Sequence, residues 1–473
     1  MGAFPFSRMP PMSSSSLTSA ERRIAYAMAG IFSTRMLGLF LIVPVFVEYS
    51  RGLRGYTPAL AGFAIGIYGL AQALLQIPLG RLSDRLGRKP VIVAGLLVFA
   101  LGSVVAALSD SMTGVIVGRA LQGAGAIASA VLALTADLTR EEHRVKIMAF
   151  IGISIGLSFA LAMVLGPLLH HFVGLSGLFW IIAGLALLGI AIVLFVVPTP
   201  VHSRFHRDTE VETGWIGQAL RNPQLLRVDF GIFALHAALM ATFVVVPGLL
   251  VHAGLGVERH WLVYLPVMVV GMGLIVPFII LAEKKRRLKG VLIGAVATLL
   301  LAELGMALVE TRFGGAMAGL AFMLLLFFAA FNLLEAMLPS LVAKLAPAAH
   351  KGTAMGVYTT AQFLGVFAGG SLGGWLLQQA GSEGVFLATA LLAGIWLVLV
   401  LGMARPPYLQ TRLLNVGPLD VAAARQLAER LGEVTGVVEV TVIPEDGVAY
   451  LKVDNRTLDE AALANLPAVR DAA

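Results

Sequence analysis

Five ionisable residues stand inside long apolar stretches of the sequence: Arg35, Arg119, His236, Glu303 and Glu335. A charged side chain at membrane depth costs on the order of 3 kcal/mol or more unless it faces a cavity or a partner, so each is a candidate functional residue. His236, Glu303 and Glu335 can also bind and release a proton, which makes them candidates for proton coupling. The expected chemistry is the movement of charge across a membrane.

The three residues that can exchange a proton each also have a structural alternative. His236 could act as a hydrogen-bond donor near a helix end, and Glu303 or Glu335 could form a fixed ion pair with an arginine. The spacing of the residues alone does not separate these roles.

A polar stripe accompanies the charged residues. Tyr68, Gln72 and Gln76 are successively four residues apart, so they share one face of a helix. Such a stripe favours a water-filled path, and a structural hydrogen-bond seam is the alternative. The predicted central cavity is lined by Arg35, Tyr68, Gln72, Gln76, Asn332 and Gln362.

The segment 80–90, GRLSDRLGRKP, has one acid among four basic residues. The Asp84 carboxylate is expected to dock against the positive N-terminal end of a neighbouring helix, where the dipole contributes about 0.3 to 1 kcal/mol. This contact would act as a conformational latch that holds one state of the protein. The residues assigned to the latch are Gly80, Asp84, Arg85, Gly87, Arg88 and Lys89.

The composition explains why these residues need a membrane to position them. Of the 473 residues, 58% are hydrophobic and 13% are charged, with 52 glycines and no cysteine. Soluble proteins are about 25% charged, so a soluble globular fold is excluded, and the apolar content also excludes intrinsic disorder. The lack of cysteine excludes disulfides, thiolate metal sites and cysteine nucleophiles.

Apolar stretches long enough to cross a bilayer recur along most of the chain. They predict an all-α polytopic membrane protein with about twelve transmembrane helices in two six-helix halves. The predicted spans are 24–47, 58–79, 91–108, 113–134, 147–170 and 178–197, then 228–251, 261–281, 290–309, 315–341, 353–377 and 384–403. In the eleventh span Gly365, Gly369 and Gly373 predict close helix packing, or a sliding surface.

The basic residues are distributed unevenly. With the N-terminus inside, the predicted cytoplasmic segments hold about 23 Lys and Arg, and the outer loops hold only Arg51, Arg54, Arg259 and Arg312. The net charge of +7 is therefore a topology signal and not a nucleic-acid surface, and both termini are expected in the cytoplasm. The predicted divisions are a cytoplasmic tail (1–23), the N-terminal half (24–197), a cytoplasmic linker (198–227), the C-terminal half (228–403) and a linker with a soluble domain (404–473).

The composition changes from membrane to soluble after Pro406. Strand, helix, strand, strand and helix patterns follow at 413–416, 419–431, 437–442, 448–453 and 458–466, the order of a ferredoxin-like α+β domain without its last strand. Small metal carriers share this layout, but this segment offers no ligand pair. We expect no metal and no cofactor.

Three motifs resemble those of the major facilitator superfamily over about 24–403. Segment 80–90 is similar to its motif A, and Arg119 with Gln122, Gly123 and Gly125 resembles motif B, whose arginine is associated with proton coupling. Residues 162–167, ending in Gly166 and Pro167, resemble motif C, which is typical of antiporters and would bend the fifth helix. The chain departs from this pattern at His170 and His171, where the family has two glycines.

Together with the run Arg35-Met36-Leu37-Gly38, the motif A segment and the C-terminal domain resemble the YajR-type transporters of bacterial inner membranes. This resemblance implies a proton-driven secondary transporter in the inner membrane, exporting small hydrophobic or amphipathic compounds by alternating access. Its expected partners are a small-molecule substrate, protons and lipid, without nucleic acid, and it is expected to be a monomer.

Other functions remain as alternatives. The same fold could serve a proton-coupled importer, and the C-terminal domain could make the protein a membrane sensor. An enzyme is disfavoured because the spans show no HExxH motif, no serine elbow and no clustered acids. A primary pump is disfavoured because no ATP-binding P-loop is present.

Overall fold

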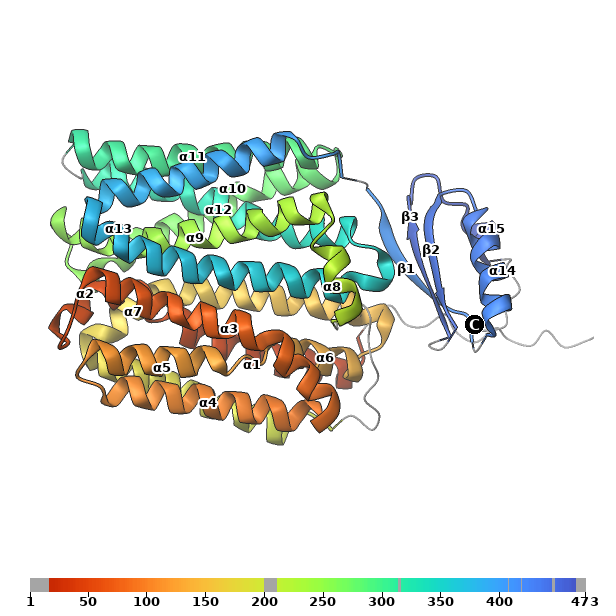
Figure 1. Cartoon of the computed structure of the whole chain (residues 1–473), viewed down its shortest axis with the longest axis horizontal. Helices are drawn as coiled ribbons and strands as arrows, with labels where there is room; N and C mark the ends of the chain where they lie inside the picture. Colours follow the sequence, from red (N-terminus) through yellow and green to blue (C-terminus); the bar gives the residue numbers. More distant parts are fainter. Residues whose placement is uncertain are drawn as a thin grey trace, which may run out of the picture.

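The computed structural model describes residues 17–199, 211–313, 316–406, 408–417, 419–444 and 447–464. In these residues, long helices run side by side and a small domain of strands and helices lies at one end (Figure 1). The predicted fold class, a helical membrane protein with a small α+β C-terminal domain, is confirmed. Several predicted features fall outside the described residues: Arg8, Arg204, Arg207, Gly315 and the end of the last helix at Leu466.

Proline and glycine shape the helices of the N-terminal half. The first helix was expected to reach Val47 but ends at Phe40, because Pro44 has no N–H and its ring would clash with the Phe40 carbonyl. The fourth predicted span is broken at residues 125–127, where Gly125 lies against the Gly95 carbonyl. The elements are α1 (Ser19–Phe40), α2 (Phe46–Tyr49), a 3-10 turn (Ser50–Gly52), α3 (Pro58–Leu86), α4 (Arg88–Leu108), α5 (Met112–Ala124), α6 (Ala128–Leu138), α7 (Glu141–Ala191) and a π-helical turn (Ile192–Val196).

Side-chain caps and N-terminal prolines start the principal helices. Thr57 caps α3 ahead of Pro58, and Asn222 caps α9 ahead of Pro223. The C-terminal half consists of α8 (Thr213–Ala219), α9 (Pro223–His252), a 3-10 turn (Val257–Arg259), α10 (Trp261–Glu283), α11 (Leu288–Phe313), α12 (Met317–Leu345), a 3-10 turn (Ala348–His350) and α13 (Lys351–Leu401).

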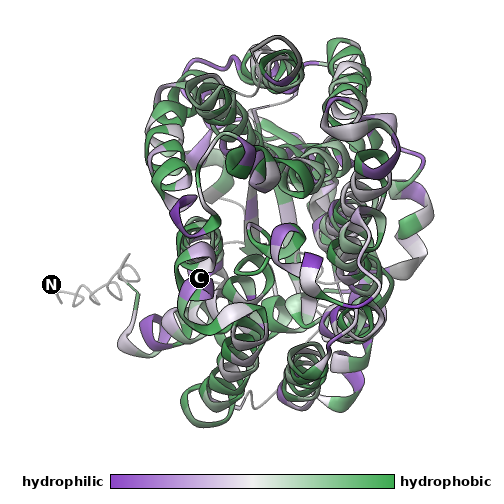
Figure 2. Ribbon diagram, turned by 90° about the vertical axis from the view of Figure 1, so that its left-hand side faces the viewer, coloured by the Kyte–Doolittle hydropathy of each residue, from purple (hydrophilic) through white to green (hydrophobic). Residues whose placement is uncertain are grey.

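Nine helices of the described residues are long and apolar enough to cross a membrane. Two of them, α7 and α13, have 51 residues each and turn back at Gly174 and Gly381, so each supplies two crossings. With α1, whose apolar run is interrupted by Arg35, the described segments make twelve crossings. The ribbons, seen end-on from the side opposite the small domain, are mostly hydrophobic (Figure 2), and many large apolar side chains are exposed, as in a surface that faces lipid.

Glycines bring the two halves into close contact along α3 and α13. A Cβ atom at Gly62 would lie 2.3 Å from the Gly370 carbonyl oxygen, and one at Gly66 would lie 2.7 Å from the Phe367 oxygen. The predicted series Gly365, Gly369 and Gly373 instead packs α13 against α9, with a Cβ at Gly369 only 2.1 Å from the Ala237 oxygen. One helix therefore uses two glycine faces.

The C-terminal domain has the predicted strand and helix order. It consists of β1 (Gln410–Asn415), α14 (Val421–Gly432), β2 (Val437–Ile443), β3 (Val448–Val453) and α15 (Glu460–Ala464). The sheet order is β1-β3-β2 with both pairs antiparallel, and Leu427, Leu431 and Leu451 are buried in its small core. The connection between β2 and β3 includes Glu445 and Asp446, which are not among the described residues.

This domain contacts the loops of the C-terminal half. The Lys452 ammonium donates to the Lys344 carbonyl at 3.2 Å and also to the Ala346 carbonyl. Tyr450 and Ile443 pack against Ala349, between α12 and α13. The domain is therefore held by the connection that leads into α13.

Candidate functional site

The polar stripe of α3 meets the charged residue of α1. The Arg35 guanidinium donates through Nη2 to the Tyr68 hydroxyl at 3.1 Å and to the side-chain oxygen of Gln72. The Gln72 side-chain amide donates to the side-chain oxygen of Gln76, Oε1, at 3.2 Å. All four side chains are buried, so the predicted stripe is a connected network inside the N-terminal half.

Tyr68 also joins Arg119 to this network. The Arg119 guanidinium carbon lies 5.0 Å from the centre of the Tyr68 ring, a cation–π arrangement. Arg119 donates to the Ala64 carbonyl at 3.3 Å and to Gln122 at 2.9 Å, and Gln122 donates to Ser103. Two deeply buried arginines therefore meet at one tyrosine without a carboxylate among the described residues beside them.

A second cluster joins three predicted residues of the C-terminal half. The Gln362 amide donates to His236 Nε2 at 2.9 Å and to Glu335 Oε1 at 3.4 Å, and His236 Nδ1 donates to the Ile232 carbonyl at 3.3 Å. Glu335 Oε2 lies 3.9 Å from His236 Nε2 and has no hydrogen-bond partner. The Asn332 amide nitrogen is buried and also unpaired. Glu335 is thus a carboxylate with one free oxygen beside an imidazole.

Glu303 is held in a different place. Its two oxygens accept hydrogen bonds from Thr242 at 3.3 Å and Thr389 at 2.7 Å, from helices α9 and α13. The side chain is completely buried, and no ion pair joins it to an arginine of the described residues. The structure therefore separates Glu303 from the cluster that contains Glu335.

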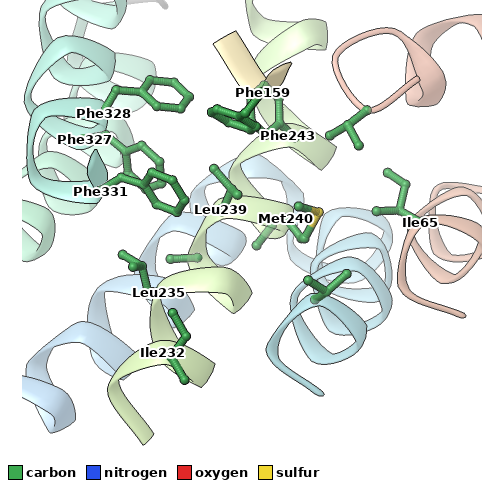
Figure 3. Close-up of a cluster of buried hydrophobic side chains, with 14 of the residues drawn as sticks. Ile65, Phe159, Ile232, Leu235, Leu239, Met240, Phe243, Phe327, Phe328 and Phe331 are labelled. Atoms are coloured by element: carbon green, nitrogen blue, oxygen red, sulfur yellow. The ribbon is translucent and has the colours of Figure 1, made fainter. Parts of the chain in front are cut away.

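Aromatic side chains connect the two halves. Phe159 of α7 lies 4.8 Å from Phe40 of α1 and 6.0 Å from Phe331 of α12, measured between ring centres. We call this set the aromatic cluster, shown in Figure 3: Phe159, Phe243, Phe327, Phe328 and Phe331. Phe331 also contacts His236 at 5.7 Å. The aromatic cluster therefore connects α1, the helix that carries Arg35, with His236 on α9.

The motif A segment is held mainly by Arg88. Its guanidinium pairs with Asp84 and with Asp137 Oδ2 at 3.2 Å, and donates to Ser83 at 3.0 Å. Lys89 donates to the Val197 carbonyl at 2.8 Å. In this structure the Asp84 carboxylate is paired with the side chain of Arg88, the first residue of α4, and not with the N-terminal N–H groups of another helix. The buried Arg88 side chain explains this difference, because it needs carboxylates to balance its charge.

A cavity of about 80 Å³ separates Asp84 from the start of α13. It lies between the halves, at the end of the bundle near the small domain, and is lined by Gln76, Gly80, Arg81, Asp84, Arg88, Ser129, Gly352, Met355, Gly356 and Thr359. Gly352 belongs to the first turn of α13. Asp84 and the N-terminal end of α13 thus face one space.

The motif C residues lie in α7. A Cβ at Gly166 would come 2.3 Å from the Leu41 carbonyl oxygen, so Gly166 lets α7 pack against the chain just after α1. Pro167 lies inside the same helix. His170, where the family has glycine, stacks on Tyr49 with ring centres 3.2 Å apart.

Several contacts of these sites were not predicted: Ser103, Asp137, Thr242, Thr389 and the aromatic cluster. Phe327, Phe328 and Phe331 do show a helical spacing, which could have indicated one inward face. Nothing in the spacing of Thr242 or Thr389 indicates Glu303 as their partner.

Comparison with known proteins decides the family. The family model of the Major Facilitator Superfamily matches residues 28–370. The chain belongs to the major facilitator superfamily. A second family model, the YajR YAM domain, matches residues 417–465, which include most of the small C-terminal domain.

Related proteins cover most of the chain. The inner membrane transport protein YajR of Escherichia coli is 50% identical over 440 residues, 93% of this chain and 96% of the relative. An uncharacterized transporter of Buchnera aphidicola is 34% identical over 74% of this chain and 89% of the relative. This major facilitator protein is therefore a multi-pass inner-membrane transporter of a small molecule, a YajR homologue, and not an enzyme.

Solved structures confirm the fold. The human organic anion transporter MFSD10 aligns with a TM-score of 0.56 at 21% identity, covering 81% of this chain and 100% of that one. A bacterial homologue of the lysosomal transporter Spinster, in an inward-facing and occupied conformation, aligns with a TM-score of 0.66 at 12% identity, covering 82% and 97%. At these identities the likeness shows the major facilitator fold alone.

Proposed function

We propose that this protein is a proton-driven exporter of small hydrophobic or amphipathic compounds that works by alternating access. The observation that carries the proposal is the division of the polar groups inside the bundle: Arg35, Tyr68 and Gln72 on one half and His236, Gln362 and Glu335 on the other. A substrate between the halves would contact both sets. Substrate sites near the midplane between repeats are usual in such transporters.

Glu335 is the first candidate for the coupling proton. Its side chain is 38% exposed, and its Oε2 atom is buried without a hydrogen-bond partner, so this oxygen has a free position for a proton. An ionised Glu335 attracts a protonated His236 ring, whereas a protonated Glu335 does not. Proton binding would thus change the contact between α12 and α9, two helices of one half.

Glu303 and Arg119 have supporting roles in the proposal. Glu303 satisfies both oxygens with threonine hydroxyls, which suits a structural acid better than an exchanging one. Arg119 is tied to α3 through Ala64 and Tyr68, so it can transmit a shift of α3 to α5. Asp84 and the start of α13 would close the cytoplasmic side as a latch when the cavity between them collapses.

The absence of cysteine makes this proposal directly testable, because two introduced thiols are the only labelling sites. Spin labels at Leu86→Cys and Lys285→Cys, on the cytoplasmic ends of the two halves, report the distance between them. We expect the distance distribution to differ between acidic and alkaline buffer, and Glu335→Gln to keep the acidic distribution at both. The control Glu433→Gln, on the exposed surface of the C-terminal domain, should behave like the parent.

Transport is tested in everted membrane vesicles with a pH-sensitive dye and a chemically broad panel of compounds. A compound that is exported should collapse the proton gradient in the parent and not in Glu335→Gln. If Glu335→Gln retained both the pH-dependent distance and the gradient collapse, the coupling role would pass to His236 or Glu303. Compound movement in the opposite direction would favour the importer.

A further inference from the structure

The substrate class can be inferred from the charge balance of the interior; this inference rests on the proposed function. We propose that the substrate is an amphipathic anion, whose acidic group binds Arg35 and whose apolar part lies on the aromatic cluster. Three observations carry it: an unsatisfied buried cation, an aromatic cluster in the same buried core as its partner Tyr68, and a carboxylate that can be neutralised.

The Arg35 side chain is the unsatisfied group. It is 1% exposed, yet its Nε and Nη1 atoms have no hydrogen-bond partner, and only Nη2 is bonded, to Tyr68 and Gln72. A buried polar donor without a partner costs about as much as a lost hydrogen bond, and a charged donor costs more. Two of its three guanidinium nitrogens are thus free for a ligand.

The charge of Arg35 has no counter-ion. Its partners Tyr68 and Gln72 are neutral, and no ion pair of the described residues includes Arg35 or Arg119. A guanidinium remains protonated in proteins, so burial cannot remove this charge. Two permanent positive charges at Tyr68 therefore favour a ligand that brings a negative one, and the planar fork of an arginine matches a carboxylate or a phosphate.

The opposite half does not require a cationic ligand in the same way. Glu335 can lose its charge by binding a proton, and one of its oxygens already accepts from Gln362. The Glu335 carboxylate can be neutralised by a proton, whereas the Arg35 guanidinium keeps its charge. The interior is therefore positively charged when Glu335 is protonated.

The apolar part of the ligand is placed by the aromatic rings. Phe40 follows Arg35 on α1 and contacts Phe159, which continues to Phe331 on α12. Figure 3 shows Phe327, Phe328 and Phe331 pointing from α12 toward Phe159 and Phe243. These rings belong to the same buried core as Tyr68, the hydrogen-bond partner of Arg35. They can provide the apolar surface that ligand sites with few polar anchors usually have.

The inference is tested with three naphthalene compounds that carry different polar groups: the anion 2-naphthoate, the neutral alcohol 2-naphthylmethanol and the cation 2-naphthylmethylammonium. Binding to the full chain in nanodiscs is measured by thermal shift and by calorimetry at fixed pH. We expect the anion to bind roughly tenfold or more tightly than the alcohol, since hydrogen bonds to charged groups are the stronger class. The cation should bind least.

Variants locate the preference. Arg35→Gln should remove the advantage of 2-naphthoate over the alcohol, Arg35→Lys should retain part of it, and Arg54→Gln, an exposed arginine, should change nothing. Equal or tighter binding of the alcohol or the cation by the parent would overturn the inference, whether or not Arg35→Gln folds. An anion preference that survived in a folded Arg35→Gln would also overturn it.

The outcomes separate this inference from the proposed function. Proton-driven export of a neutral or cationic compound in vesicles would preserve the proposed function and refute the anionic class. Arg35-dependent binding of 2-naphthoate without any coupling of proton movement to transport would preserve the class and refute proton-driven export.

Discussion

Arg286 and Asp454 form a two-pronged ion pair between the transmembrane helices and the C-terminal domain, with bonds of 2.7 Å and 3.3 Å. Arg286 stands in the short connection from α10 to α11 and also lies 5.2 Å from the ring centre of Tyr408. Tyr408 in turn accepts a hydrogen bond from the Leu288 backbone at 2.8 Å. The domain is therefore attached to the loop that corresponds to the motif A segment of the first half.

Replacing one partner should release the domain. We expect Asp454→Asn or Arg286→Ala to increase hydrogen exchange in β3 and proteolysis of the linker at 404–409. The control Arg287→Ala, the exposed neighbour, should leave both unchanged. Unaltered exchange in Arg286→Ala would show that Lys452 and the apolar contacts hold the domain without this pair.

The same pair gives docking a pH dependence. The hydrogen bonds from Arg286 hold the pKa of Asp454 below its ordinary value. A lowered pKa means that the contribution to docking is complete above the ordinary pKa of aspartate, about 3.9, and is lost as the pH falls through the lowered value. Spin labels on the domain and on α11 should report a docked domain from neutral pH down to about the ordinary pKa of aspartate. They should report undocking as the pH falls further, through the lowered pKa of Asp454.

The latch is tested at Asp84. Asp84→Asn removes a charge that pairs with Arg88 and faces the start of α13, and a helix-terminal charge contributes about 0.3 to 1 kcal/mol. We expect the labels at Leu86→Cys and Lys285→Cys to shift toward the open cytoplasmic side by a factor of about two to five in population. Asp110→Asn, which removes a carboxylate at the opposite end of the bundle, should not shift them.

Close packing of α3 on α13 predicts a steric effect. Gly62→Ala would place a methyl group 2.3 Å from the Gly370 oxygen, so the helices must separate, at about 1 to 3 kcal/mol. The expected result is weaker closure of the outer side, measured by labels at the outer ends of the halves. Gly273→Ala, with no atom within 4 Å of the added methyl, is the matched control.

The role of Glu303 can be separated from coupling by its threonine partners. Thr389→Val leaves one carboxylate oxygen without its donor, and we expect about 1 to 3 kcal/mol lower stability in thermal unfolding. Thr298→Val, which removes a hydroxyl bonded only within α11, should cost much less. If Thr389→Val had normal stability but lost proton coupling, Glu303 would be assigned a role in proton coupling and not a structural one.

The sequence was sufficient for features that follow from local spacing. The apolar runs predicted the helices, the four-residue spacing predicted one face for Tyr68, Gln72 and Gln76, and alternation predicted the strands β2 and β3. It was not sufficient for partners on distant segments, such as Arg35 on the α3 stripe or Thr389 on Glu303. Those contacts depend on helix rotation and tilt, which packing of the whole bundle determines.

The Asp84 contact shows the same limit. The segment predicted an acid that docks on a helix end, but the pairing in this structure is with Arg88, because the sharp turn at Gly87 brings the first residue of α4 back to the end of α3. In the proposed latch, a narrower space toward α13 would let Asp84 reach the start of that helix.

The turns at Gly174 and Gly381 have backbone angles that differ by only a degree or two, with φ of 67° and 68° and ψ of −175° and −173°. Residues other than glycine essentially do not adopt this region. The same unusual turn before the last helix of each half is what a duplicated ancestral six-helix gene would leave behind. Each pair of helices joined by such a turn is a rigid hairpin, so both copies would have kept the glycine while the loops around them diverged.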